Sequence, residues 1–251
     1  AASPAAGDWG YIQFKDSSTN ATFDHNGAYQ AGSILEYVIV EYGGGIGNVA
    51  ENGAVWTYGA SPFINYSTFR YNKSWGLYFE TDDVFKVTNN TFHHNSVTHP
   101  ALYDGAVAFK NYACVFLSGC EYVVDTSEGS EIHVSGNTIT NTGGKNAIRY
   151  EVRKSGVTTY ITNNVITGNL LLDDTLLVFI NAIGDSDYVI SNNNISNNTT
   201  EYAVNLYANA DSTYDTNMTF SNNLLKDNSV PAGPDEGGAI GIHAHEGATV
   251  T

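Results

Sequence analysis

One phrase recurs along this chain, an apolar–x–Asn–Asn–x–apolar–x–x–Asn frame. Copies begin at residues 35, 64, 87, 134, 161, 190 and 220, the first two being weaker. Successive starts are 29, 23, 47, 27, 29 and 30 residues apart, which is the range in which internal repeats indicate a solenoid. A single repeat cannot bury its own apolar face, so the repeats must stack around a continuous core.

A second phrase precedes each frame, with a small residue leading into alternating apolar positions. Its copies occupy residues 10–14, 53–57, 76–79, 105–109, 146–150, 176–180, 202–206 and 238–242. A period of two predicts strands, so each rung carries at least two short strands separated by turns. Asparagine suits the left-handed backbone of sharp turns, and stacked asparagines would satisfy buried amides along a ladder. We therefore expect an all-β solenoid of about eight rungs, one for each copy of the second phrase.

These two phrases resemble the right-handed parallel β-helix of pectate-lyase-like and NosD-type repeat proteins. The resemblance covers nearly the whole chain, and it implies a single elongated domain over residues 1–251. Both ends fall within a rung, so we expect a fragment of a longer chain, with flanking domains or self-association at the open ends. The fold implies no particular activity, because it carries lyases, hydrolases, epimerases, adhesins and spacers.

A narrower resemblance rests on the opening AASPAAGDWGYIQFKDSS and on LEYVIVEYGG at residues 35–44. Both segments are similar to the disaggregatase-related surface β-helices of methanogenic archaea. Such enzymes dismantle a chondroitin-like cell envelope. The resemblance therefore implies an acidic, amino-sugar-containing polysaccharide as the substrate.

The charge balance limits the partners. Lys and Arg total 10 against 26 Asp and Glu, a formal charge of −16, which argues against nucleic acid and anionic membranes. No apolar run approaches the roughly 20 residues that span a bilayer, so we expect no membrane insertion. The 17 tyrosines, the scarce cations and the Asn/Thr/Ser/Gly-rich surface favour an extracellular or cell-surface location. Cys114 and Cys120 leave both a disulfide and two free thiols open.

Aligning the second phrase on its inward residues predicts three outward columns. The first contains Gln13, Trp56, Tyr78, Ala108, Arg149, Phe179, Asn205 and Gly241. The second contains Lys15, Tyr58, Glu80, Lys110, Glu151, Asn181, Tyr207 and His243. The third contains Ser17, Ala60, Asp82, Tyr112, Arg153, Ile183, Asn209 and His245. Side chains in adjacent rows of a column are within contact distance because parallel strands lie roughly 4.8 Å apart.

These columns concentrate the scarce cations and many aromatic residues. Predicted substrate-binding residues are Trp56, Tyr58, Tyr78, Tyr207, Asn209 and His243. Aromatic faces stack on sugar rings and polar edges bind hydroxyls. Two longer insertions, at about residues 16–33 and 110–133, leave this sheet on the same edge and would wall a groove.

The predicted groove contains the groups that β-elimination of a uronate polymer needs. A cation neutralises the carboxylate, a base removes the adjacent proton and an acid protonates the leaving oxygen. Lys110, Arg149, Arg153 and Tyr112 supply these types within two rows. Alternatively, Ca²⁺ would neutralise the carboxylate, with Glu80, Asp82 and Glu151 as its oxygen ligands. A reaction without a cofactor stays equally open.

Hydrolysis and a structural role are the alternatives. Glu80 and Glu151 lie two rows apart, roughly 9.6 Å, near the upper end of the spacing of inverting glycosidases. The alternating charges of Glu80, Lys110 and Glu151 also fit simple cross-strand pairing on a non-catalytic, structural or adhesive envelope module. Such a module predicts a flat face with paired charges.

Other polar residues carry less weight. His243, His245 and Glu246 resemble a metal-binding group, but their place on the last row favours an interface or end surface. His93 and His94 lie away from the predicted face and are interpreted as solvated. The acidic pairs at 82–83 and 173–174, and the acids at 185 and 187, are typical of turns.

Overall fold

The computed structural model describes residues 3–44, 53–81, 83–95, 105–111, 131–152, 156–182, 185–210, 215–230, 238–244 and 248–251. Within these ranges, residues 105–111, 151–152, 177, 179–182 and 209–210 are described by their backbone alone. All regular structure in the described ranges is β-strand. No helix there is long and apolar enough to cross a membrane.

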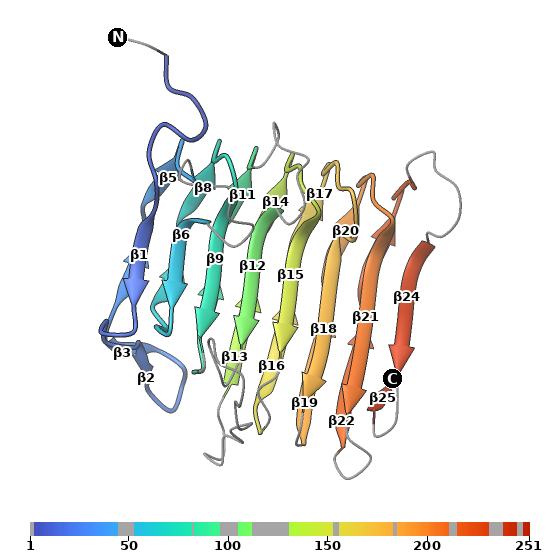
Figure 1. Cartoon of the computed structure of the whole chain (residues 1–251). Helices are drawn as coiled ribbons and strands as arrows, with labels where there is room; N and C mark the ends of the chain where they lie inside the picture. Colours follow the sequence, from blue (N-terminus) through green and yellow to red (C-terminus); the bar gives the residue numbers. More distant parts are fainter. Residues whose placement is uncertain are drawn as a thin grey trace, which may run out of the picture.

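Three parallel sheets run along the molecule, and each turn of the chain adds one strand to each sheet (Figure 1). Sheet 1 contains β1 (Ile12–Lys15), β6 (Gly53–Tyr58), β9 (Trp75–Thr81), β12 (Gly105–Asn111), β15 (Asn146–Val152), β18 (Leu176–Ala182), β21 (Tyr202–Ala210) and β24 (Gly238–Ala244). Sheet 2 contains β4 (Ile34–Glu36), β7 (Phe63–Asn65), β10 (Lys86–Thr88), β13 (Glu131–Ser135), β16 (Thr158–Thr162), β19 (Ser186–Ser191), β22 (Thr216–Ser221) and β25 (Ala248–Val250). Sheet 3 contains β5 (Ile39–Glu41), β8 (Thr68–Arg70), β11 (Thr91–His93), β14 (Thr138–Thr140), β17 (Val165–Thr167), β20 (Asn194–Ser196) and β23 (Leu224–Lys226). The predicted all-β solenoid is confirmed.

The second phrase forms sheet 1, and the asparagine frame forms sheets 2 and 3, with a bend at its Asn–Asn pair. Inward side chains of all three sheets meet in one continuous core that includes Val55, Ile64 and Phe69, each 0% exposed. Phe69 of β8 stacks on Phe92 of β11, with ring centroids 4.8 Å apart. A rung therefore buries its apolar residues only by stacking on its neighbours.

The predicted register is correct along sheet 1 except at β18. Ile148 pairs with Leu176, and Arg149 pairs with Leu177. The prediction placed Phe179 in the row of Arg149, but Phe179 pairs with Glu151 instead, two residues further along. The run LeuLeuValPheIle is apolar at every position, so its sequence has no alternation from which the register could be derived.

The two bends that flank sheet 3 have left-handed backbone. In the described part of the chain, every non-glycine residue with positive φ lies at one of them. The first bend, between sheets 2 and 3, has Tyr37, Tyr66, Asn89, Gly136, Asn163, Asn192 and Asn222. The second bend, after sheet 3, has Tyr42, Tyr71, His94, Asn141, Gly168, Asn197 and Asp227. This conformation costs most L-residues ~1–2 kcal/mol, and Gly and Asn tolerate it best.

The residue after each left-handed position points inward, and at the first bend it builds an asparagine ladder. The ladder comprises Asn90, Asn137, Asn164, Asn193 and Asn223. The backbone N–H and the Nδ2 of Asn164 both donate to Oδ1 of Asn193, at 3.0 Å each. Nδ2 of Asn164 also donates to the carbonyl of Val134 at 3.0 Å. The predicted stacking of buried amides is confirmed, and the carboxamide group is fully hydrogen-bonded.

The second bend carries a similar ladder with one interruption. Asn72 donates to Asn95, and Asn169 donates to Asn198, through both backbone N–H and Nδ2. Thr142 occupies the position between these two segments, and its backbone N–H donates to Oδ1 of Asn169 at 2.9 Å. At the other positions of the ladder, an asparagine donates to the carboxamide oxygen of the asparagine in the following rung. Threonine has no carboxamide oxygen to accept such a bond.

The predicted insertion at 16–33 contains a small antiparallel hairpin of β2 (Thr22–Phe23) and β3 (Tyr29–Ala31). Phe23 packs on Phe63 with ring centroids 5.3 Å apart. The N-terminal segment covers the first strand of sheet 3, where Nε1 of Trp9 donates to the carbonyl of Glu41 at 2.8 Å. The insertion at 110–133 lies mostly outside the described residues, as do Cys114 and Cys120.

Candidate functional site

The outward face of sheet 1 contains the predicted site, and its strands are the long arrows at the front of Figure 1. Burial alternates along β6: Val55 and Thr57 are 0% exposed, while Trp56 and Tyr58 between them are partly exposed. In the next strand, Glu80 pairs with Tyr58. The register of the first two predicted columns is therefore correct apart from the shift at β18, but their members on β9, Tyr78 and Glu80, are buried at 2% and 7% exposure.

Some predicted site residues fall outside the described residues. These are Asp82, Tyr112 and Arg153, together with His245 and Glu246. Lys110 and Glu151 are described by backbone position alone; the first pairs with Glu80 and the second with Lys110. Asn209 likewise pairs by its backbone with Asn181. Of the three carboxylates expected to hold Ca²⁺, only Glu80 has a described side chain, so the geometry of such a site stays a hypothesis.

The aromatic residues of the face form two groups. At the N-terminal side, Tyr11 lies edge-on to Trp56 with centroids 5.4 Å apart, and Trp56 lies edge-on to Tyr58 at 6.0 Å. Tyr78 is only 2% exposed, and it packs with Trp75 and with Trp56, its register partner on the adjacent strand. Tyr78 therefore does not present its ring to solvent. This packing also separates a small apolar cluster from the main core.

The second aromatic group lies near the C-terminal side of the face. Tyr207 of β21 pairs with His243 of β24, and their ring centroids are 5.9 Å apart. His243 is exposed and Tyr207 is partly exposed. Both predicted binding residues therefore reach the surface, five and six strands away from Trp56 in the order of sheet 1.

Arg149 lies between these two groups, beside a buried polar cluster of Asn146, Asp174 and Asn205. Nδ2 of Asn146 donates to the carbonyl of Asp174 at 3.0 Å, and Nδ2 of Asn205 donates to Oδ2 of Asp174 at 3.2 Å. Asn146 and Asp174 are 0% and 2% exposed. In each of the three side chains, Oδ1 is buried and has no hydrogen-bond partner among the described residues. A buried acceptor without a partner is costly, and a bound water or ion, local strain or a catalytic role accounts for such groups in proteins.

The carboxyl group of Asp174 is strongly perturbed. Burial, followed by the charge of Asp173, raises its pKa to about 7, while the Asn205 hydrogen bond and the charge of Arg149 oppose the rise. Asp174 therefore changes its charge near neutral pH. Such perturbed groups gather at functional sites. The sequence interpretation took residues 173–174 as an ordinary acidic turn and missed this residue. No signal in the sequence marked it, because Asp174 lies just before β18, the strand whose register could not be derived.

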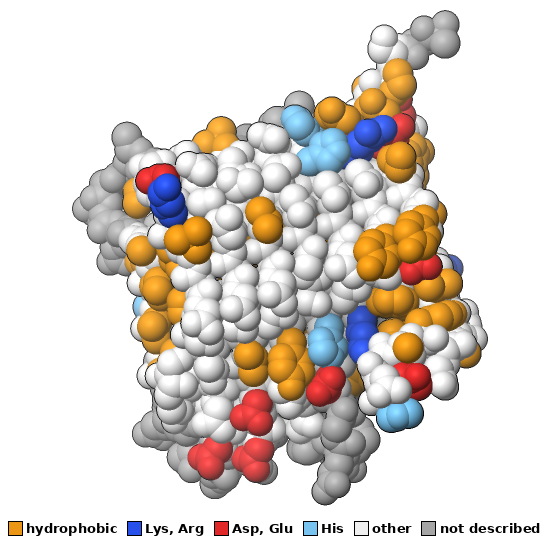
Figure 2. All heavy atoms as spheres, turned by 180° about the vertical axis from the view of Figure 1, so that it is seen from behind, with side chains coloured by type: hydrophobic (Ala, Val, Ile, Leu, Met, Phe, Trp, Pro, Cys, Tyr) orange, Lys and Arg blue, Asp and Glu red, His pale blue; other side chains and the backbone are white. Residues whose placement is uncertain are grey.

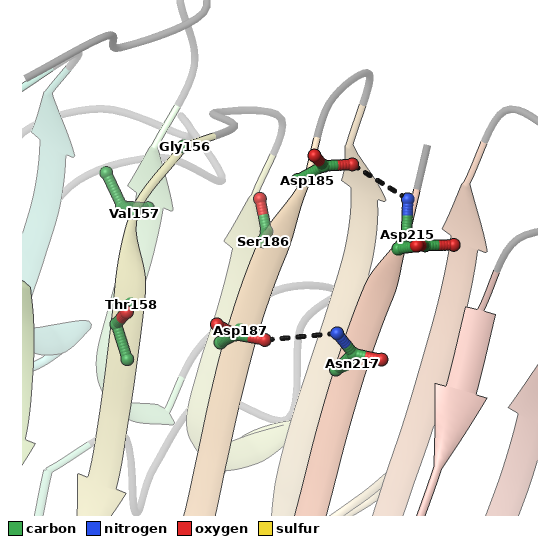
Figure 3. Close-up of a pocket in the computed structure, with 8 residues that line it drawn as sticks. All are labelled: Gly156, Val157, Thr158, Asp185, Ser186, Asp187, Asp215 and Asn217. Atoms are coloured by element: carbon green, nitrogen blue, oxygen red, sulfur yellow. Dashed lines mark hydrogen bonds between the residues drawn. The ribbon is translucent and has the colours of Figure 1, made fainter. Parts of the chain in front are cut away.

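A separate hollow of about 350 Å³ lies at the start of β16, β19 and β22 (Figure 3). Asp185, Asp187 and Asp215 line it together with Asn217. Oδ1 of Asp185 accepts from the backbone N–H of Asp215 at 2.9 Å, and Oδ1 of Asp187 accepts from Nδ2 of Asn217 at 3.2 Å. The described residues contain no group of three or more His, Cys, Asp or Glu arranged to hold a metal ion. The hollow is therefore an acidic surface feature built from strand-to-strand contacts.

Comparison with known proteins gives one result. A family model described as a right-handed beta helix region matches residues 76–251, which is more than half of the chain. Neither the curated proteins nor the solved structures give a match.

Proposed function

This chain belongs to the right-handed β-helix family, and we propose that it is an extracellular enzyme that binds an acidic polysaccharide along the outward face of sheet 1 and cleaves it. The observation that carries the proposal is the cluster around Arg149. There, the cation Arg149 lies in the same cross-strand row as Asn205, whose partly exposed side chain carries a buried Oδ1 without a partner among the described residues. Sugar hydroxyls are donors that would satisfy such acceptors, and a guanidinium binds a carboxylate through two hydrogen bonds.

The net negative charge of the protein means that an anionic polymer can bind only where cations are placed locally. A chain with a formal charge of −16 repels a polyanion at long range. Binding of a uronate polymer then requires cations placed where the sugar carboxylates lie. Arg149 provides one on the outward face, and the position of Lys110 on the adjacent strand provides a second. Trp56, Tyr58 and Tyr207 flank the cluster on both sides and suit sugar rings.

The reaction we propose is β-elimination. A base removes the proton next to the sugar carboxylate, the released electron pair forms a C4–C5 double bond, and the C4–O4 bond breaks as the leaving oxygen takes a proton. Arg149 would neutralise the carboxylate, which acidifies the adjacent C–H. Lys110 is the proposed base, with Tyr112 as the acid and Arg153 as a further cation. Asp174 is too buried to touch the sugar, so we assign it the positioning of Asn205 and the tuning of the field at Arg149.

The resemblance of the two N-terminal segments to disaggregatase-related proteins suggests the substrate class. We propose a chondroitin-like cell-envelope polysaccharide, and a cell-surface location follows from that substrate. Ca²⁺ held by Glu80, Asp82 and Glu151 would share the neutralisation of the carboxylate if the reaction needs a metal. The same three carboxylates would carry the chemistry if the enzyme were a hydrolase.

The test is incubation of the purified chain with chondroitin-like and pectin-like polymers, with Ca²⁺ and with a chelator. Absorbance of unsaturated uronate and new reducing ends are followed together. Rising absorbance that depends on Arg149 supports the lyase. Reducing ends without absorbance would instead support a hydrolase. No signal in either channel on any polymer would overturn the proposal in favour of a non-catalytic structural or adhesive envelope module.

A further inference from the structure

The two bends around sheet 3 differ between the first rungs and the later ones. In the first two rungs, all four left-handed positions are tyrosines: Tyr37 and Tyr66 at the first bend, Tyr42 and Tyr71 at the second. Later described rungs have Asn, Gly, His or Asp there. We call these four residues the tyrosine platform. Bulky side chains rarely adopt this backbone conformation, so a requirement other than the turn itself must account for them.

The platform is exposed and ordered. Tyr37 and Tyr66 stack with ring centroids 5.3 Å apart and an interplanar angle of 3°, and Tyr42 and Tyr71 stack at 5.8 Å and 11°. Tyr37 is 74% exposed and Tyr66 is 51% exposed. The back view shows hydrophobic side chains gathered toward the N-terminal side, whereas the middle of this face is mostly white (Figure 2). The rings therefore lie against water, where an aromatic surface is costly unless it is covered.

Polar groups lie between the two tyrosine pairs. On β5 and β8, Nε of Arg70 binds Oε2 of Glu41 at 2.6 Å. On β11, His93 lies edge-on to Tyr71 with centroids 5.5 Å apart, and its Nδ1 is 2.9 Å from Nδ1 of His94. The pKa of His93 is lowered by burial, by His94 and by Arg70. The histidines were interpreted as simply solvated, but they pack against the platform.

The charges of this surface cancel on sheet 3, while Glu36, next to the first bend, adds one carboxylate, which accepts from Nδ2 of Asn65 at 2.9 Å. Glu41 and Arg70 form an ion pair, and the lowered pKa of His93 keeps its imidazole neutral at neutral pH. A nearly balanced surface on a chain with a formal charge of −16 fits an uncharged ligand. The apolar face of a sugar ring stacks on an aromatic ring, and the sugar hydroxyls hydrogen-bond to polar groups. Aromatic rings with polar groups between them therefore suit a sugar.

We propose that the tyrosine platform, with Glu41, Arg70 and His93, is a binding site for an uncharged polysaccharide. Apolar faces of the sugar rings lie on the exposed tyrosine rings, and sugar hydroxyls bond to the ion pair and to the imidazole. The site is on sheet 3 and its bends, not on sheet 1. It therefore does not depend on the proposed cleavage of an acidic polymer, and it would hold the protein on a second, neutral glycan.

The test is calorimetric titration of the full chain with cellohexaose and with chitohexaose, comparing the wild type with the double variant Tyr37→Asn/Tyr66→Asn. Asparagine is the residue that later rungs use at the first bend, so the variant keeps the turn and removes only the rings. We expect at least one of the two probes to bind and the double variant to weaken it at least tenfold, with an unchanged or higher melting temperature. Tyr37→Phe should bind as the wild type does. Tyr160→Thr, which removes a ring stacked on His133 on sheet 2, is the matched control.

Three results would overturn the proposal. The first is that neither hexasaccharide binds the wild type. The second is that the double variant binds as tightly as the wild type. The third is a loss of binding that comes with a lower melting temperature of the double variant, which would make the rings a structural stack. Sedimentation of both proteins covers the remaining case, since self-association that depends on Tyr37 and Tyr66 would assign the surface to a second copy instead.

Discussion

Buried amide side chains behave differently in two regions of this molecule. At the bends, Asn164 uses its carboxamide oxygen and both carboxamide hydrogens in hydrogen bonds to neighbouring rungs. In the polar cluster beside Arg149 on sheet 1, Asn146 and Asn205 each donate one hydrogen bond but leave a buried Oδ1 without a described partner. The same residue type is therefore fully hydrogen-bonded in one region and only partly hydrogen-bonded in the other.

This difference separates side chains that stabilise the fold from side chains that are candidates for function. The ladders repeat from rung to rung because every rung needs the same bend. The cluster around Arg149 occurs once among the described rungs. On the two adjacent strands, the register partners of Arg149 are Ala108 and Leu177. A repeated, satisfied group serves the fold, whereas a single unsatisfied one is a candidate for function.

The largest effect should come from breaking a ladder. Asn164→Ala removes the oxygen that accepts from Asn137 and the hydrogens given to Val134 and Asn193. Several buried groups then lose their partners, at 1–3 kcal/mol each, so we expect a loss of ~5 kcal/mol in the free energy of unfolding. Urea denaturation measures it. Asn163→Gly, at the exposed left-handed position next to it, is the control and should change stability by less than about 0.5 kcal/mol.

A smaller effect, on activity rather than stability, should follow from Arg149→Ala. Loss of a charge-stabilising donor typically lowers the rate ~10²–10³-fold, which is about 3–4 kcal/mol. The measurement is kcat/KM on the polymer that the wild type cleaves. Arg149→Lys should recover only part of the rate because it lacks the two-pronged geometry. Lys226→Ala removes an exposed cation of sheet 3 and should leave the rate unchanged; equal losses in both alanine variants would mean that only net charge matters.

Stability should fall as the pH rises, through Asp174. Its pKa is 3.8 in an unfolded chain and about 7 in the fold, so the folded state holds the proton that the unfolded state releases. The stabilisation is complete below pH 4 and is lost as the pH rises through 7. Between pH 5 and pH 8 the loss amounts to roughly 2.5 kcal/mol. Melting curves of the wild type and of Asp174→Asn across this range test it, since the variant should lack this component of the slope.

The smallest effect should come from repairing the second ladder. Thr142→Asn would place a carboxamide between Asn95 and Asn169, and we expect a gain of ~1 kcal/mol. Differential scanning calorimetry of the single variant measures it. A loss of stability would show that the backbone at this rung is too close for the larger side chain, and that the interruption is a packing constraint.

Much of the fold could be predicted because two repeated patterns indicate it. One is the alternation of apolar residues in the second phrase, and the other is the asparagine frame. The frame starts mark both bends, and the inward apolar positions form the observed core except on the end strands β1 and β24, where Ile12, Ile240 and Ile242 are exposed because no further described rung covers them. The register of β18 could not be predicted, because LeuLeuValPheIle has no polar residue to mark the outward side. The predicted site was harder. Residues 82, 112 and 153 lie outside the described residues, and the partners of Lys110 and Glu151 are known only as strand positions.

Asp174 shows why the site could not be derived from residue types alone. An Asp–Asp pair before a strand is a common turn, and its sequence does not reveal that the second carboxyl is buried. Burial depends on which neighbours the rungs bring to it, here Asn146 and Asn205, which lie 28 and 31 residues away. The left-handed tyrosines were hidden for a similar reason, since tyrosine is not a residue that predicts such a turn.

The ladders also give the solenoid a direction. Each asparagine donates to the one in the following rung and accepts from the one before it, so the hydrogen-bond chain has a donor end and an acceptor end. A duplicated stretch of one repeat length, such as residues 161–189, would present the same oxygen to the rung before it and the same hydrogens to the rung after it. Such a coil can lengthen by copying whole turns in tandem. Gene duplication can thus extend the outward surface without redesigning the interior.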